Sequence, residues 1–206
     1  DLWNHEDFSS PKYARFLVES IPSATMAHGR LAYVTYASQG NVAHRIPIGD
    51  FTKAPFGDPG FGDPADWHHQ AITVKNRSDG VAGIEIKLYI DGVHNDTTLT
   101  TTGYAGETQA NLEMNIGAYL HAPDAITFAA FGGAVGGPAG KGWNGAGAAP
   151  VLFDEFRFWK TARSHKEIGR YWFTQVGGGT NEREIDTTDR GNIDLGVYYK
   201  FNEGIL

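Results

Sequence analysis

The sequence contains no cysteine, few positive charges and no long apolar run. The absence of cysteine excludes a disulfide framework and a thiolate metal site. Its 17 Lys and Arg residues stand against 24 Asp and Glu residues, and the net charge of −7 disfavours a nucleic-acid partner because it repels phosphate. Since no stretch of 18 consecutive apolar residues occurs, insertion into a membrane is not expected either.

The sequence is instead rich in glycine and aromatic residues, and its apolar residues alternate. It holds 27 glycines in 206 residues, and 41% of its residues are hydrophobic. Alternation with a period of two predicts half-buried strands. These patterns, together with short apolar runs, fall at 15–19, 31–36, 71–74, 84–90, 112–116, 152–159 and 195–201. About eight strands in a chain of this length predict an all-β fold, an antiparallel β-sandwich.

One short helix is predicted after the strand at 152–159. Ser164 and Glu167 form a capping box, in which each side chain accepts a hydrogen bond from the other's backbone. Ile168, Tyr171 and Trp172 then follow at helical spacing and predict an apolar stripe. We expect the glycines at 177–179 to end this helix.

Three segments, in this order, resemble the laminin-G type of concanavalin-like jelly roll. They are W-H-H-Q-A-I-T-V at 67–74, L-Y-I-D-G-V at 88–93 with L-E-M-N-I-G-A at 112–118, and the stretch from F-D-E-F-R-F-W at 153–159 to Glu167 and Ile168. The second segment includes Asp91-Gly92, a pair that favours a tight hairpin turn. The resemblance implies a jelly roll, a fold shared by lectins, adhesion modules, glycanases and virion proteins.

The two ends of the sequence suggest a module boundary. G-V-Y-Y-K-F-N-E-G at 196–204 is similar to the motif that opens such a module, whereas the first residues are similar to strands of a module already begun. We therefore expect a jelly-roll module at 1–176 without its opening strand, a polar linker at 177–192 and the start of a following module at 193–206. Alternatively, the motif near the C-terminus supplies the missing strand.

Asp154 is the candidate metal ligand. Alternation places it on the face of Leu152, Phe156 and Phe158, which predicts a largely buried carboxylate that needs a partner. Backbone amides or a hydroxyl satisfy it in one interpretation. In the other it binds Ca²⁺, as the resemblance to lectin-like modules implies, with loop oxygens of Asp91, Asp96 and Asp124 as further candidates. His68 and His69 are adjacent on a strand and point to opposite faces, which argues against a shared zinc ion.

The glycine-rich stretch at 132–150 carries the candidate recognition patch. Trp143 offers an aromatic face on which a sugar ring can stack, and polar groups near it can hydrogen-bond sugar hydroxyls. The predicted ligand-binding residues are Lys141, Trp143, Asn144, His121 and Asp124. The competing interpretation is that Trp143 packs against the sandwich, as large aromatic residues commonly do.

The sequence shows no arrangement of catalytic residues. Retaining glycanases need two carboxylates about 5 Å apart, and this superfamily places them as Glu-x-Asp-x-Glu on one strand. Residues 182–186 hold carboxylates in the reverse order within a polar stretch, and Asp154 and Glu155 point to opposite faces. Asn76 and Asn95 match the pattern of N-glycosylation sites, which matters only in a secreted eukaryotic protein.

The sequence therefore predicts a non-catalytic structural or recognition module of a larger extracellular or virion-surface protein. Its partners would be glycans or neighbouring subunits in an oligomeric assembly. The V-Y-Y-K-F-N-E-G motif and the cysteine-free composition rich in glycine, alanine and threonine resemble those of repeated jelly-roll modules in bacteriophage structural proteins. The alternatives are a polysaccharide-active glycanase of the same superfamily and a secreted calcium-dependent lectin or adhesin.

Overall fold

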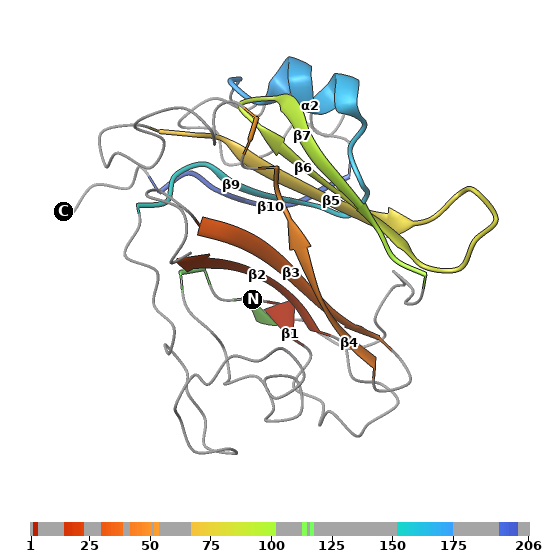
Figure 1. Cartoon of the computed structure of the whole chain (residues 1–206). Coiled ribbons are helices and arrows are strands. Elements are labelled where there is room, and N and C mark those ends of the chain that lie inside the picture. Colours follow the sequence, from red (N-terminus) through yellow and green to blue (C-terminus); the bar gives the residue numbers. More distant parts are fainter. Residues whose placement is uncertain are drawn as a thin grey trace, which may run out of the picture. The chain divides into compact units, whose positions relative to one another are not determined.

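The computed structural model describes residues 2–3, 15–22, 30–38, 42–50, 52–53, 67–101, 113–114, 116–117, 152–174 and 194–201. These residues form antiparallel sheets and a single helix, so the prediction of a strand-rich, antiparallel protein with one short helix is confirmed at that level. The elements are labelled in Figure 1.

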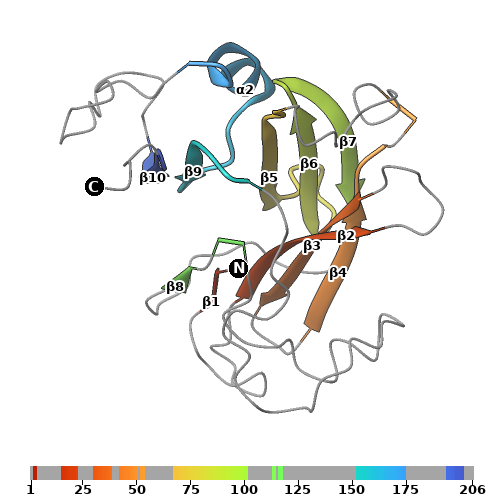
Figure 2. The ribbon, with the colours of Figure 1, turned by 90° about the vertical axis from the view of Figure 1, so that its left-hand side faces the viewer.

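The largest sheet has five strands in the order β4-β3-β2-β1-β8. They are β1 (Leu2–Trp3), β2 (Arg15–Pro22), β3 (Arg30–Ser38), β4 (Val42–Ile48) and β8 (Glu113–Met114). All neighbours pair antiparallel, and β3 lies between β2 and β4 (Figure 2). Ile46 and Ile48 of β4 are buried, as alternate residues of a half-buried strand are expected to be.

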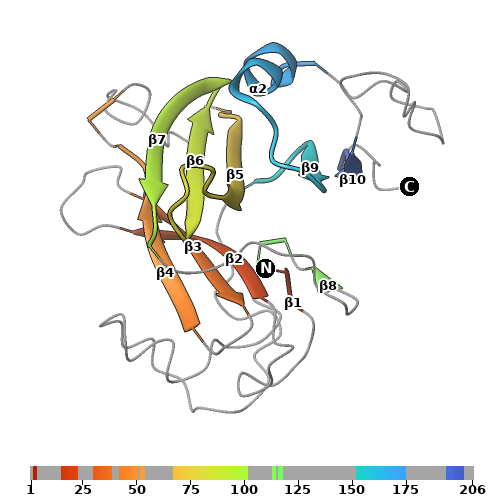
Figure 3. The same cartoon turned by 90° about the vertical axis from the view of Figure 1, so that its right-hand side faces the viewer.

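A three-stranded sheet holds most of the described core. β6 (Ile84–Ile90) lies between β5 (Gln70–Asn76) and β7 (Val93–Leu99), an arrangement visible in Figure 3. The predicted face of β6 is confirmed, because its apolar residues Ile84, Ile86, Leu88 and Ile90 are all at most 1% exposed. Tyr89, which alternation assigned to the opposite face, is buried as well.

The turn between β6 and β7 has the conformation that its sequence predicts. Asp91 and Gly92 have φ of 50° and 76°, the left-handed values that a two-residue hairpin turn requires. Asp tolerates this conformation better than most residues, and glycine adopts it without steric cost. The Asp91-Gly92 pair therefore fixes the register of the β6–β7 hairpin.

A two-stranded antiparallel sheet joins β9 (Phe156–Trp159) to β10 (Leu195–Tyr199). Their register pairs Phe156 with Tyr199 and Phe158 with Val197, so these four side chains share one face. β9 starts at Phe156, four residues later than predicted, after Glu155 at a φ of 52°. The pairing also gives the C-terminal motif a partner strand at 156–159.

The helix α2 (His165–Tyr171) begins as predicted and ends early. Ser164 is its N-cap, and both hydrogen bonds of the capping box are present. Ile168 is buried, in agreement with the apolar stripe. The helix ends at Tyr171 with Trp172 as its C-cap, so the prediction that glycines 177–179 end it is wrong. Strands β1, β4 and β7 were not among those predicted.

The chain divides into two compact units, each built from separated segments. One consists of residues 1–49, 76–85 and 98–151, and the other of residues 50–75, 86–97 and 152–206. β5, β6 and β7 each contribute residues to both. The part of the chain that the structure describes contains no helix long and apolar enough to cross a membrane.

Candidate functional site

Two of the segments that carry the resemblance, 67–74 and 88–93, meet at the carboxylate of Asp91. The backbone amide of His69 donates to Asp91 Oδ1 at 2.8 Å, and Nδ1 of His68 lies 2.9 Å from Oδ2. The amide of Asp91 in turn donates to the carbonyl of His69 at 2.9 Å. Asp91 therefore joins the start of β5 to the β6–β7 turn. We call Trp67–His69, Asp91, Gly92 and Trp172 the Asp91 junction.

Gly92 allows the end of α2 to approach the same turn. A Cβ added to Gly92 would lie 2.1 Å from Cδ1 of Trp172, and one added to Gly169 would lie 3.3 Å from the Gly92 carbonyl oxygen. No real Cβ tolerates the first of these distances, so the indole of Trp172 can occupy this position only over a glycine. The motif residues at Asp91 and Gly92 thus seat α2 and its C-cap on the hairpin turn.

His69 has an unusual environment inside this junction. Its ring centroid lies 6.1 Å from that of Trp172, and its Nδ1 is buried without a hydrogen-bond partner in the described structure. Burial lowers the pKa of His69, the positive charge of Arg157 lowers it further, and Asp91 opposes them. A neutral histidine in contact with Trp172 is consistent with a structural role.

Arg157 ties β9, β10 and the end of α2 together. Its Nη1 donates to the carbonyl of Tyr171 at 3.2 Å, and its Nη2 donates to the carbonyl of Thr174 at 2.6 Å and to Glu155 Oε2 at 3.1 Å. The hydroxyl of Tyr198 donates to the same Glu155 oxygen. Burial and the Glu155 carboxylate raise the pKa of Tyr198 to about 12. Glu155 and Arg157 of the sequence motif thus connect secondary-structure elements, with Arg157 satisfying helix-terminal carbonyls.

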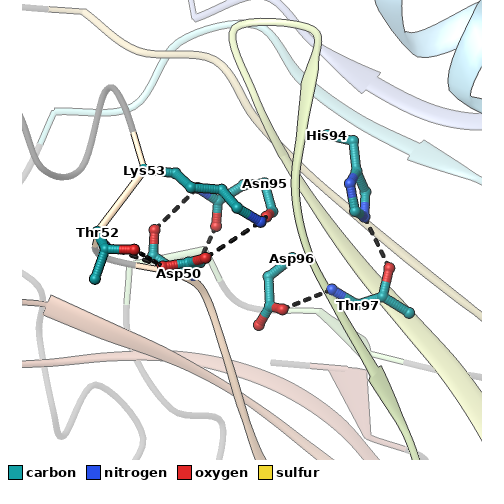
Figure 4. Close-up of polar contacts among 7 residues, drawn as sticks. All are labelled: Asp50, Thr52, Lys53, His94, Asn95, Asp96 and Thr97. Carbon is teal, nitrogen blue, oxygen red and sulfur yellow. Dashed lines mark hydrogen bonds and ion pairs between the residues drawn. The ribbon is translucent and has the colours of Figure 1, made fainter.

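A second polar cluster attaches residues 50–53 to β7 (Figure 4). Asn95 accepts from the amide of Asp50 at 2.8 Å and donates to its carbonyl at 3.2 Å. Lys53 Nζ donates to the Asn95 carbonyl at 2.8 Å and lies 3.2 Å from Asp50 Oδ2. Hydrogen bonds from Thr52 lower the pKa of Asp50. Since Asn95 is 2% exposed and both ends of its amide are engaged, the folded chain does not present it for glycosylation.

The carboxyl groups whose pKa values shift in the described part of the chain all shift downwards. They are Asp50, Asp79 and Glu167, and in each case hydrogen bonds to the ionised form are the largest cause. Arg77 binds Asp79, and Ser164 binds Glu167 as part of the capping box. A carboxyl group that acts as a general acid at neutral pH needs a raised pKa. The lowered pKa values of these three groups instead suit them to stabilising turns and helix caps.

The expected burial of Asp154 is wrong. The residue is exposed, and its Oδ1 accepts a hydrogen bond from the amide of Glu155 at 2.9 Å. Alternation fails here because β9 begins only at Phe156, and Leu152 is exposed as well. In the described ranges no three His, Asp or Glu side chains lie close enough together to hold a metal ion. Asp91 is engaged by His68 and His69, and Asp96 Oδ1 accepts from the amide of Thr97. Asp124 lies outside the described residues, so calcium binding stays a prediction.

The predicted recognition patch lies outside the described residues. This applies to all five of its members, Lys141, Trp143, Asn144, His121 and Asp124, and to the carboxylates at 182–186. The linker at 177–192 lies outside them too.

A row of aromatic side chains on the β9–β10 sheet was not predicted from the sequence. The ring centroids of Phe156 and Tyr199 are 6.5 Å apart, and those of Tyr199 and Phe201 are 6.0 Å apart. Tyr199 and Phe201 are each 49% exposed. The signal was available in the alternation of Val197, Tyr199 and Phe201, but only the pairing of β10 with β9 adds Phe156 to the row.

Comparisons of the chain with protein-family models, with curated proteins and with solved structures find no match.

Proposed function

We propose that this chain is a non-catalytic recognition module of the laminin-G-like jelly-roll type, within a larger extracellular or virion-surface protein, and that it binds glycans. The observation that carries the proposal is the contrast between engaged polar groups and exposed aromatic rings. The exposed rings are Tyr199 and Phe201, which are each 49% exposed and neighbour one another on the β9–β10 sheet. Neighbouring exposed aromatic rings offer apolar faces on which sugar rings can stack, and such exposed apolar groups mark binding surfaces.

The jelly-roll part of the proposal rests on the residues that resemble that family. Asp91 binds the W-H-H segment, Gly92 receives Trp172, and Arg157 fixes the end of α2. These contacts give the motif residues of three separate segments a shared role in the fold. Such a role supports the interpretation that the resemblance is one of architecture, from which the function must be argued separately.

The non-catalytic part rests on the engagement of the carboxylates. Asp91 holds the start of β5, and Glu155 receives Arg157 and Tyr198. Glu167 and Asp79 have lowered pKa values and fixed hydrogen-bond donors. An assay of reducing ends released from polysaccharides tests this part. Turnover that is lost on substitution of a carboxylate would favour the glycanase alternative.

A glycan array probed with the whole chain tests the binding function. We expect retention on at least one glycan, and we expect Trp143→Ala to abolish it if the patch at Trp143 carries recognition. Trp67→Ala is the matched control, because it removes an exposed tryptophan from another place. Unchanged retention of Trp143→Ala with an intact fold would reject that patch, and no retention of the wild type would reject glycan binding.

Contact with neighbouring subunits is the second candidate function. The exposed apolar side chains that precede β9, Leu152 and Phe153, favour it, because large exposed apolar groups also mark protein interfaces. Sedimentation of the chain over a range of concentrations tests this candidate. A stable oligomer that buries an interface of standard size would support assembly as the main role.

A further inference from the structure

The aromatic row on the β9–β10 sheet (Phe156, Tyr199 and Phe201) is continuous. Phe156 and Tyr199 face each other across the antiparallel pair, with an interplanar angle of 30°. Phe201 continues the row beyond the end of β10, at 34° to Tyr199. The planes of neighbouring rings in the row are therefore closer to parallel than to edge-on.

The backbone at Phe201 has a conformation that is unusual for a bulky residue. Its φ is 52°, in the left-handed region, where a bulky side chain rarely occurs. Such strain persists only where other interactions hold it, and it concentrates at ligand-binding and catalytic sites. Here it accompanies a ring that remains half exposed.

We infer that the aromatic row binds the faces of the sugar rings of a neutral glycan chain. The C–H groups on a pyranose face carry partial positive charge and are attracted to the negative face of an aromatic ring. A row of three rings suits several successive sugars better than one small ligand. This inference rests on the proposed glycan-binding function, and it names a stacking surface that does not include Trp143.

Charges of both signs flank the row. Asp154 is an exposed carboxylate two residues before Phe156, whereas Lys200 lies between Tyr199 and Phe201 in the sequence. The chain as a whole carries a net charge of −7, which disfavours a sulfated or carboxylated glycan, so the inference is made for a neutral one.

Affinity electrophoresis of the full chain tests the inference directly. Native gels would contain laminarin, hydroxyethyl cellulose or yeast mannan, with dextran sulfate as the anionic probe. We expect at least one neutral polysaccharide to retard the wild type and dextran sulfate not to. The double variant Tyr199→Ala/Phe201→Ala should weaken that binding by about tenfold or more, as expected when central aromatic contacts are lost.

Phe173→Ala is the matched control, because Phe173 is an aromatic residue of similar or greater exposure that lies outside the row. It should bind like the wild type. If a neutral polysaccharide still retards the double variant, the aromatic row is not the binding surface, although the protein does bind glycans. A wild type that no neutral polysaccharide retards would overturn both the row and the proposed function.

Conservative variants keep the test valid if the double variant unfolds. Tyr199→Phe and Phe201→Tyr retain the ring faces and should change the dissociation constant by no more than about twofold. Tyr199→Gln retains a long side chain but no ring and should lose binding, with circular dichroism confirming the fold. Equal binding by Tyr199→Phe and Tyr199→Gln would overturn the inference. A wild-type dimer in sedimentation that the double variant Tyr199→Ala/Phe201→Ala converts to a monomer would overturn it in favour of a protein partner.

Discussion

β6 and β10 are both alternating apolar strands, but they differ sharply in burial. The apolar face of β6 is at most 1% exposed, whereas Tyr199 of β10 is 49% exposed and its neighbours Leu195 and Val197 are only partly covered. β6 has a partner strand on each side, β5 and β7, while β10 is paired with β9 alone in the described structure. Alternation therefore specifies a strand with two faces, and the neighbouring elements decide how far each face is withdrawn from water.

The difference suggests a division of roles within one sequence. β6 and the carboxylate of Asp91 hold the fold, because the apolar face of β6 is buried and Asp91 is bound by His68 and His69. The β9–β10 sheet keeps large rings accessible, which costs stability and is consistent with recognition. Four substitutions or titrations test this division, and they are described from the largest expected effect to the smallest.

Leu88→Ala should give the largest loss of stability. Leu88 is fully buried in the central strand of the three-stranded sheet, so the substitution leaves a cavity and loses its transfer free energy. The expected cost is about 2–5 kcal/mol in the free energy of unfolding, measured by urea denaturation. Leu99→Ala, at an exposed position of β7, is the control and should cost well under half as much. Equal costs would show that β6 is not the centre of the core.

Gly92→Ala should destabilise the Asp91 junction by two separate effects. The left-handed φ costs about 1–2 kcal/mol for a residue with a Cβ, and the clash with Trp172 adds about 1–3 kcal/mol. Gly80→Ala separates them, because Gly80 has a φ of 81° but nothing within 4 Å of the added Cβ. Thermal unfolding of both variants measures the difference. If the two lose the same stability, Trp172 does not rest on Gly92 as described.

Acid should weaken the junction through His69. Its pKa is lowered in the folded state, so the unfolded chain binds a proton first as the pH falls below about 6.5. The unfolded state then holds more protons, and the free energy of unfolding decreases until the folded protein is protonated as well. His69→Phe keeps a ring against Trp172 and should flatten the stability curve between pH 7 and pH 5. Parallel curves for wild type and variant would show that His69 is not buried in its neutral form.

Tyr199→Ala should have the smallest effect on stability. Its ring is half exposed, and loss of the cross-strand contact with Phe156 should cost about 0.2–1 kcal/mol. The same variant is expected to weaken glycan binding, so that stability and binding separate at this position. A loss as large as that of Leu88→Ala would place Tyr199 in the core and remove the contrast between β6 and β10.

The features that were predicted correctly from the sequence are those that depend on residues close together along the chain. The strand at 84–90 and its buried face, the Asp91-Gly92 turn and the Ser164–Glu167 capping box were all found as expected. Each is local, because a pleat, a turn or a cap is determined by residues within a few positions of one another. Boundaries were less accurate: β9 begins at Phe156, and α2 ends at Tyr171.

The tertiary structure decided which distant residues act together. No spacing in the sequence indicates that Asp91 binds His68 and His69, that Gly92 lies beneath Trp172, or that Asn95 fixes Asp50. The exposure of Asp154 and the joining of Phe156 to Tyr199 and Phe201 likewise follow from where β9 begins and which strand it pairs with. Alternation by itself determined the two faces of each strand. Only the pairing of strands far apart in sequence determined which of those faces is buried and which carries an accessible aromatic row.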